Sequence, residues 1–110
     1  MSAPTKRLIR TQGGTMKLPN FPQPLEIASH DNTIVVGVTD WGHPTGVQLE
    51  PEALDLDGAD LAARIMTLYQ YARTIALAVR NVDHHRTTGN WMPSWPTPTH
   101  VDILAAQITF

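Results

Sequence analysis

The chain has no cysteine among its 110 residues. Without cysteine there is no disulfide framework, no thiolate metal site and no cysteine nucleophile, and the composition suits a reducing compartment. The chain also lacks an apolar run near the ~20 residues of a membrane-spanning helix. No apolar stretch follows the basic residues near the N-terminus, as it would in a signal peptide. We therefore expect a cytoplasmic protein without a membrane anchor.

Sequence motifs of catalysis are missing as well. There is no glycine-rich phosphate loop, no nucleophile elbow and no pair of carboxylates in a pocket-like setting. His84 and His85 are adjacent, so on a helix they point about 100° apart and cannot ligate one metal without another histidine. The acids between residues 50 and 60 lack the alternate spacing and the glycine of a calcium loop. We predict a non-enzymatic protein without cofactor or metal, in which these histidines lie on the surface and these acids form a solvated connection.

Basic residues are absent from 18–60, a stretch that holds eight acids. Residues 1–17 show the opposite pattern, with four bases and no acid, although the formal net charge of the whole chain is only −2. The charge is therefore arranged in blocks, and the remaining bases lie along or just after the helix predicted below. These are Arg64, Arg73, Arg80 and Arg86.

The strongest periodic signal runs from Asp57 to Asp83. Apolar residues recur there at alternating steps of four and three, which places them on one face of a helix. Asp57 is placed to accept hydrogen bonds from the free amides of the first turn. At roughly 1.5 Å per residue the helix spans about 40 Å, which is longer than a small core needs, so we expect part of it to contact another chain. The positions predicted to pack on the sheet are Leu61, Ile65, Leu68, Ala72 and Ile75, and their predicted partners in the strands are Ile27, Ile34, Val36, Val38, Val47 or Leu49. Ile65→Asp is therefore expected to unfold the domain, because it would bury an unpaired charge among apolar groups. The polar segment after Asp83 is predicted to end the helix, with Gly89 as the stop.

Alternating apolar residues and β-branched residues before the helix predict strands at 25–29, 33–39 and 45–50. Turn-prone segments at 30–32 and 40–44 separate these strands. A three-stranded sheet with one apolar face needs a cover, and the long helix is the only element able to supply it. The predicted fold class is therefore α+β, with a three-stranded antiparallel meander packed on one long helix.

The two ends of the chain differ from this central part. Residues 1–24 contain four prolines and a Gly-Gly pair, so we predict a flexible leader whose bases belong to a solvated tail. Residues 25–110 are predicted to form a single domain that ends in a Pro/Trp-rich extension, MPSWPTPT, held extended by its prolines. A short C-terminal helix is expected at 99–107.

Several large apolar residues fall outside the predicted core. Met66, Tyr69 and Leu77 lie off the main stripe, so the helix is apolar on more than one side. A wide core face would explain them, and a second face buried in a dimer is the interpretation we favour. Trp91 and Trp95 are expected to fold back on the domain or on a partner. Because a two-fold pair covers such faces with the same patch from each chain, we predict a homodimer with these five residues at its interface.

A resemblance to a known family rests on residues 25–84, roughly half the chain. A strand TIVVGVT, a turn with Asp40 and Gly42, a strand GVQLE and a helix follow one another there. The order resembles the ESX (type VII) secretion-associated proteins of mycobacteria, in particular the Esp proteins whose central region has the fold of the YbaB/EbfC nucleoid-associated family. The chain departs from them in its short basic leader, its shortened C-terminal helix and its lack of a helix before the sheet. The matching helix positions are Leu61-Ala62, Ile65, Ala72-Arg73 and Ala76.

The resemblance implies a YbaB-like domain in a non-enzymatic, dimeric, cytosolic protein that serves a type VII secretion locus as an accessory or chaperone-like factor. Its partner would be a secretion substrate or another protein of that locus, and export of the chain itself stays open. The alternative is a nucleoid-associated DNA-binding protein. Affinity for DNA rests on neutralising several phosphates at once, and the eight acids in 18–60 argue against it. The phosphate contacts of this alternative would fall to Lys6, Arg7, Arg10, Arg64, Arg73, Arg80 and Arg86.

Overall fold

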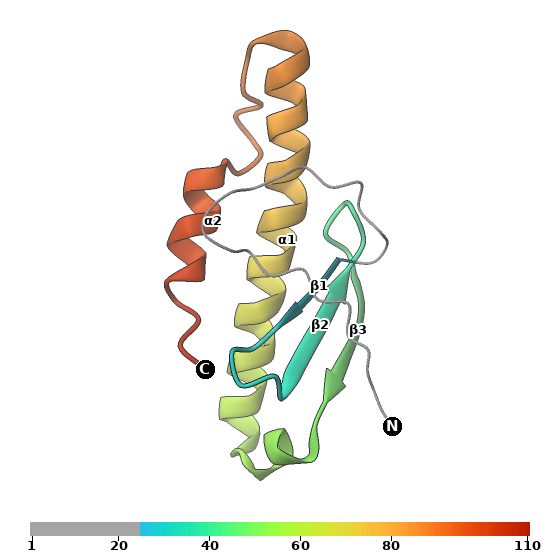
Figure 1. Ribbon diagram of the computed structural model, residues 1–110, viewed down its shortest axis with the longest axis vertical. Coiled ribbons are helices and arrows are strands. Elements are labelled where there is room, and N and C mark those ends of the chain that lie inside the picture. The colour runs from blue at the N-terminus through green and yellow to red at the C-terminus, as the bar shows by residue number, and fades with distance from the viewer. Residues whose placement is uncertain (1–24) are drawn as a thin grey trace.

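The computed structural model describes residues 25–110. A three-stranded antiparallel sheet packs on a long helix, and a short C-terminal helix runs alongside that helix, which confirms the predicted α+β fold class (Figure 1). The predicted leader, residues 1–24, lies outside the described residues. The elements in chain order are β1 (Leu25–Ala28), β2 (Ile34–Val38), β3 (Pro44–Leu49), the 3-10 helix η1 (Pro51–Asp55), α1 (Gly58–Thr88) and α2 (Pro98–Ala105).

The sheet has the strand order β1-β2-β3, with every pair antiparallel. β1 and β2 are shorter than predicted, whereas β3 has its predicted length but begins at Pro44, one residue before its predicted start. Proline is tolerated there because the first residue of an edge strand owes no hydrogen bond to a neighbour. The β1–β2 turn uses a left-handed Asn32, at φ 62°, a conformation that asparagine tolerates better than most residues.

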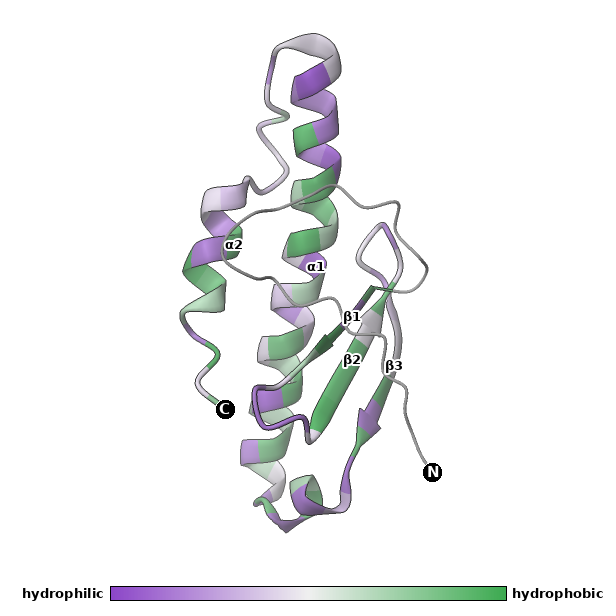
Figure 2. Ribbon diagram, viewed as in Figure 1, coloured by the Kyte–Doolittle hydropathy of each residue, from purple (hydrophilic) through white to green (hydrophobic). Residues whose placement is uncertain are grey.

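The core lies between the sheet and α1. β2 is the central strand and all five of its residues are buried, and Figure 2 shows it mostly in the green of apolar residues. Each fully buried aliphatic side chain contributes roughly 1.5–3 kcal/mol through the hydrophobic effect, so this layer supplies most of the folding energy. Its buried members include Leu25, Ile27, Ile34, Val36, Val38, Leu68, Ala72, Ile75, Ala76 and Val79.

The edge strand β3 is far less covered than β2. Val47 pairs with Val36 across the sheet and therefore points to the same side, yet it is 45% exposed. The reason is that α1 packs over β1 and β2, whereas β3 lies beyond the helix. The prediction that Val47 packs on the helix is therefore wrong, because the structure leaves much of this side chain in solvent. Leu49, at the end of the strand, does pack against the core.

The start of α1 differs from the sequence-based expectation, whereas its end agrees with it. The helix begins after Asp57, but the Asp57 side chain makes no capping hydrogen bond, and only its backbone carbonyl accepts, from the Leu61 amide at 2.9 Å. At the other end the polar segment after Asp83 continues the helix to Thr88, and Gly89 ends it as predicted, with φ 80° and an amide N–H that donates a hydrogen bond to the His85 carbonyl. Such a left-handed residue is the usual glycine stop of a helix.

The C-terminal segment returns along α1. α2 begins at Pro98 with Thr97 as its N-cap, two residues before Thr99, which was the predicted N-cap. Figure 1 shows α2 running back alongside α1. Val101 of α2 is buried, and Leu104, Ala105 and the following Ile108 also pack at the core. Among residues 25–110, no helix is long and apolar enough to cross a membrane.

Candidate functional site

All three tryptophans of the chain gather near the C-terminal half of α1. Trp41 lies in the turn between β2 and β3, and its ring meets that of Trp95 edge-to-face at 6.0 Å. Trp95 in turn meets His84 of α1 at 6.3 Å. Trp91 stacks on His85, with ring centroids 4.2 Å apart and planes 14° from parallel. We refer to these five residues as the aromatic surface.

The aromatic surface is open to solvent. Trp41 is 47% exposed and Trp91 is 43% exposed, whereas Trp95, which contacts Trp41 and His84, is half-buried. Large aromatic side chains dominate the energetics of protein interiors and interfaces, and each buries 150–250 Å² when fully covered. Two partly exposed tryptophans on so small a domain therefore mark the strongest candidate for a binding surface among the described residues.

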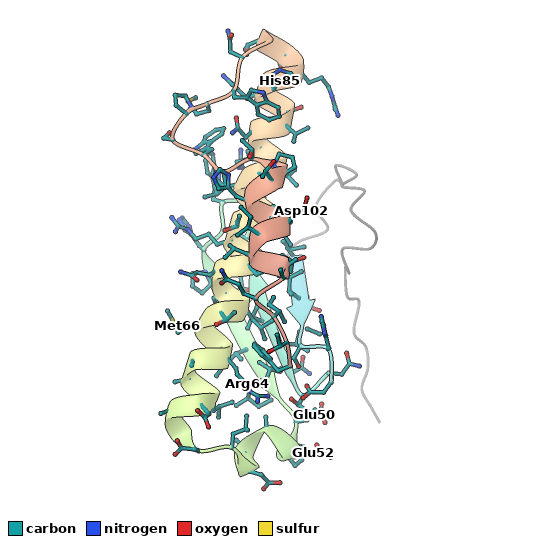
Figure 3. The ribbon with its side chains drawn as sticks, turned by 90° about the vertical axis from the view of Figure 1, so that its left-hand side faces the viewer. Glu50, Glu52, Arg64, Met66, His85 and Asp102 are labelled. Carbon is teal, nitrogen blue, oxygen red and sulfur yellow. The ribbon has the colours of Figure 1, made fainter. Side chains whose placement is uncertain are left out.

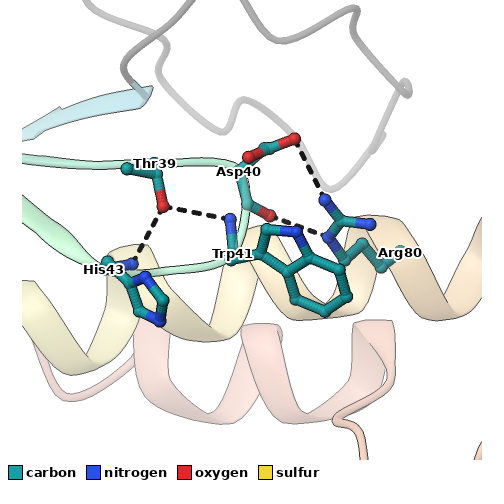
Figure 4. Close-up of polar contacts among 5 residues, drawn as sticks. All are labelled: Thr39, Asp40, Trp41, His43 and Arg80. Atoms are coloured by element: carbon teal, nitrogen blue, oxygen red, sulfur yellow. Dashed lines mark hydrogen bonds and ion pairs between the residues drawn. The ribbon is translucent and has the colours of Figure 1, made fainter.

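A tight turn fixes the backbone around Trp41 (Figure 4). The Thr39 hydroxyl oxygen accepts hydrogen bonds from the amides of Trp41, at 3.2 Å, and His43, at 3.1 Å. The Gly42 amide donates to the Thr39 carbonyl at 2.8 Å. Gly42 has φ 81° and is buried against α1, where an added β-carbon would lie 2.7 Å from Cγ of Arg73. The turn thus needs glycine for both its conformation and its close approach to the helix.

Arg80 of α1 holds this turn and its tryptophan in place. Its Nε donates to the Asp40 carbonyl and its Nη2 pairs with the Asp40 carboxylate, each at 3.0 Å. The guanidinium also lies 3.4 Å from the centre of the Trp41 ring, as Figure 4 shows. Partly exposed ion pairs and cation–π contacts are each worth about 1 kcal/mol or less. Together they restrict the rotamers of Trp41 more than they stabilise the fold.

Asn81 anchors the extension that carries Trp95. This asparagine is fully buried, and its Nδ2 donates to the carbonyls of Met92, Trp95 and Pro96 at 3.0–3.2 Å. Its Oδ1 accepts from the Met92 amide at 2.8 Å. Prolines cannot donate backbone hydrogen bonds, so the carbonyls near them need other donors. The Asn81 side chain supplies hydrogen-bond partners for much of this segment.

Asn81 was missed by sequence reasoning, although a signal was present. It lies between Val79 and Val82 of the apolar stripe, where a polar side chain needs a buried partner. The proline-rich extension that follows the helix offers such partners. An asparagine within the apolar face of a helix, followed by a segment with several prolines, therefore indicates that its side chain bonds the backbone of that segment and holds it on the helix.

The structure places the predicted interface residues in two separate regions. Trp91 and Trp95 belong to the aromatic surface, whereas Met66 is 63% exposed on the opposite half of α1 (Figure 3). Met66 precedes His85 by 19 positions, which is about 28 Å along a helix. Tyr69 is half-buried and its hydroxyl donates to the Gly46 carbonyl at 2.8 Å, and Leu77 is half-buried.

The predicted core and nucleic-acid residues also separate by position. Leu68, Ala72 and Ile75 are buried, whereas Leu61 and Ile65 are half-buried at the margin of the core. Of the bases, Lys6, Arg7 and Arg10 lie outside the described residues, and Arg80 is engaged by Asp40 and Trp41. Arg64 lies over the Phe110 ring at 4.9 Å. Arg73 is exposed and has no ion-pair partner within 25–110.

Titratable groups give little sign of catalytic chemistry in the described part of the chain. Asp31 is the residue whose pKa is clearly lowered, because its carboxylate accepts hydrogen bonds from the Ser29 and Thr33 side chains and from the Thr33 amide. These bonds tie together the β1–β2 turn. Within residues 25–110 no three histidines or acids come close enough to hold a metal ion.

A shallow groove of about 300 Å³ lies on the face of the sheet that points away from α1. Its floor is formed by the facing glycines of β2 and β3, which carry no side chains. The groove holds a single carboxylate and no cluster of groups able to perform acid–base chemistry. Its lining residues are Glu26, Val35, Gly37, Thr45, Gly46, Val47 and Gln48.

No protein-family model, curated protein or solved structure matches this chain. The arrangement of the aromatic surface is therefore the main basis on which a function can be argued.

Proposed function

We propose that the protein is a non-enzymatic, chaperone-like accessory factor of type VII (ESX) secretion, which acts in the cytoplasm by binding other proteins. The class of function, protein binding, is supported by the aromatic surface. The link to secretion is supported by the resemblance of residues 25–84 to the Esp proteins. The single observation that carries the proposal is the exposure of Trp41 on a turn that the fold holds in place.

Rigidity is what makes an exposed tryptophan informative. Binding sites concentrate their energy in a few tryptophan, tyrosine and arginine side chains, and a side chain already ordered in the free protein loses less entropy when a partner covers it. Trp41 is ordered from below by Arg80 and from the side by Trp95. Trp41 is thus already ordered in the free protein, so little further side-chain entropy is lost when a partner binds.

Dimer formation is part of the proposal. The outer edge of β3 pairs with no other strand among residues 25–110, and the strand carries no charge that would block pairing. Met66, Leu54 and Ile103 add exposed apolar area outside the aromatic surface. A second copy would cover such area with the same patch from each chain. Light scattering at micromolar concentration tests this, since a dimer has twice the mass of the 12.1 kDa chain and a monomer would contradict it.

Purification from a mycobacterial host tests the secretion assignment. A tagged chain is expected to retain a protein encoded at a type VII secretion locus, and the purified pair should then form a complex in isolation. A matched chain with Trp41→Ala should retain less of that protein if the aromatic surface takes part. Absence of any secretion-locus protein from the wild-type sample, in a host that expresses the locus, would contradict the proposal.

DNA binding, the alternative function, has weaker support. A duplex carries one negative charge per ≈1.7 Å, and affinity grows with the number of phosphates that are neutralised. Arg80 is already paired with Asp40, and the acids Glu50 and Glu52 lie close to the lower end of α1 (Figure 3). A gel shift at low salt separates the two functions, because retardation of DNA at micromolar protein would favour the alternative.

A further inference from the structure

We infer that the surface around Trp41 is a docking site for an acidic peptide segment that carries a large apolar side chain. This inference deepens the proposed function and rests on it, because it names the chemistry of the partner that the protein binds. The site consists of Trp41 and His43 from the β2–β3 turn and Arg73 and Leu77 from α1.

The four residues lie on one continuous surface. Gly42 packs on the Arg73 side chain, so the turn that presents Trp41 and His43 sits directly on that part of the helix. Leu77 is four residues after Arg73 and three before Arg80, spacings that place all three on the same side of a helix. Arg80 in turn contacts the Trp41 ring. The apolar side chains of Trp41 and Leu77 are thus adjacent to Arg73, which has no ion-pair partner among residues 25–110.

Charge supports an acidic occupant. From Leu61 to Thr88 the helix carries four arginines and a single acid, Asp83, whereas the acids of the chain cluster before the helix. The carboxylate nearest the turn, Asp40, is already paired with Arg80. Arg73 is exposed and has no ion-pair partner among the described residues. A guanidinium with open donors recognises a carboxylate through two parallel hydrogen bonds.

The apolar part of the occupant follows from the tryptophan. One face of the Trp41 ring is covered by Arg80 and its edge by Trp95, yet nearly half of the residue is exposed. A carboxylate alone would leave this surface in water. A large apolar side chain beside the carboxylate would cover it and strengthen the neighbouring ion pair by excluding water.

Nucleic acid fits the same surface less well. A polyanion needs a track of several unpaired cations along its backbone, and the site offers Arg73 as its free arginine, with Arg80 engaged by Asp40. A short peptide needs one well-placed cation and one apolar platform. The observations therefore favour the peptide, and nucleic acid becomes an outcome of the test.

The test is a titration of the full-length, ¹⁵N-labelled protein, followed by NMR. The probe is a synthetic peptide of acidic residues interspersed with leucine and phenylalanine. One control peptide has lysine in place of each acid, and a single-stranded oligonucleotide serves as the second control. Saturable shifts are expected for the Trp41 indole N–H and for the amides of residues 39–43, with the acidic peptide only.

Variants show whether the shifts come from this site. Trp41→Ala and Arg73→Gln are each expected to weaken peptide binding about tenfold or more, the size of effect typical of an interface hot spot. Arg73→Gln keeps the aliphatic stem that packs on Gly42, so it removes the charge without opening the turn. Arg86→Gln is the matched control, because Arg86 is exposed on the same helix outside the site. It should leave binding within about twofold.

Several results would overturn the inference. These are the absence of saturable shifts, equal binding of the lysine peptide, tighter binding of the oligonucleotide, or equal weakening by Arg86→Gln. Failure of this inference is separable from failure of the proposed function. A secretion-locus protein retained equally by wild type, Trp41→Ala and Arg73→Gln would overturn the docking site and leave the proposed function intact. Peptide binding at Trp41 without any secretion-locus partner would support the docking site and contradict the proposed function.

Discussion

The protein uses aliphatic and tryptophan side chains in different regions. The core between the sheet and α1 consists of leucine, isoleucine, valine and alanine, with Tyr71 as its aromatic member. The aromatic surface holds every tryptophan of the chain and is tied down by hydrogen bonds, ring contacts and one ion pair. The core is stabilised by the burial of apolar area, which does not depend on the orientation of individual contacts. The aromatic surface is ordered by hydrogen bonds, ring contacts and an ion pair, each of which requires a specific geometry.

This difference separates what stabilises the fold from what could recognise a partner. Removing a core side chain should destabilise the whole domain. Changing a residue of the aromatic surface should alter the positions of its neighbouring side chains more than it lowers the stability of the fold.

The largest effect is expected for Leu68→Asp. Leu68 is completely buried, so the substitution would place an unpaired charge among apolar groups, at a cost of several kcal/mol. We expect loss of the cooperative thermal transition measured by circular dichroism. Gln70→Asp, two residues away and exposed, is the matched control and should melt close to the parent chain. Similar behaviour of the two variants would show that the buried face of α1 is wrongly assigned.

The margin of the core should respond less than its centre. From the sequence, Ile65 and Leu68 were equivalent members of one apolar stripe, and either charge substitution would be expected to unfold the domain. The structure leaves Ile65 half-buried, because the stripe extends past the end of the sheet. Ile65→Asp should therefore lower stability without abolishing the cooperative transition.

An effect smaller than that of Leu68→Asp is also expected for Asn81→Ala. The variant leaves three carbonyls and one amide of the Pro/Trp-rich extension without their partner, and we expect a loss of about 2–4 kcal/mol, because unsatisfied buried groups keep their desolvation cost. Urea denaturation measures this loss. The tryptophan fluorescence should also shift to the red as Trp95 becomes more exposed. Asn90→Ala, in an exposed position, should change neither quantity.

The next effect concerns the turn that presents Trp41. Gly42→Ala forces a β-carbon onto Arg73 and into a left-handed conformation, and we expect a loss of about 1–3 kcal/mol. Gly46→Ala is the control, since a β-carbon there meets open space and alanine restricts the unfolded chain more than glycine does. It should be neutral or slightly stabilising. Equal losses from the two variants would argue against the docking of the turn on α1.

A smaller effect is expected from the Arg80–Asp40 pair. A double-mutant cycle with Arg80→Gln and Asp40→Asn should give a coupling energy of about 0.5–1 kcal/mol, because both side chains are partly exposed and solvent screens the pair. Chemical denaturation of the four chains measures the coupling. In the same variants, the Trp41 indole N–H should show increased motion by NMR relaxation. A coupling near zero, with Trp41 unchanged, would show that the turn is ordered without this pair.

The sequence was sufficient to predict the core and the fold class for a physical reason. Helical and strand periodicity report which side of an element is apolar, and burial depends only on that side. Leu68, Ala72 and Ile75 could therefore be named together, and β2 could be recognised from TIVVGVT. Periodicity carries no information about where an apolar face stops, which is why the exposure of Val47 and the partial exposure of Leu61 were not predicted.

The candidate site was predictable only in part. Trp91 and Trp95 were expected to fold back on the domain or a partner because of their size, but their contacts with His84, His85 and Asn81 depend on a reversal of the chain after Gly89. The Arg80–Asp40 pair joins residues 40 positions apart, and nothing local in the sequence connects them. Trp41 was noted only as part of a turn. Its exposure follows from how the turn docks on α1, a tertiary contact that composition and spacing do not report.

The smallest effect is expected for Asp31 in the β1–β2 turn, which lies outside both the core and the aromatic surface. Hydrogen bonds from Ser29 and Thr33 lower the pKa of Asp31 below its ordinary value of 3.8, so these bonds stabilise the folded protein when the carboxylate is ionised. The contribution is present above pH 3.8 and is lost as the pH falls through the lower folded pKa. Because Asp31 is almost fully exposed, we expect a difference well below 1 kcal/mol between wild type and Asp31→Ala at neutral pH. Urea denaturation at a series of pH values should show this difference shrinking toward zero in acid. A difference that stays constant with pH would mean that Asp31 acts through turn conformation, independent of its charge.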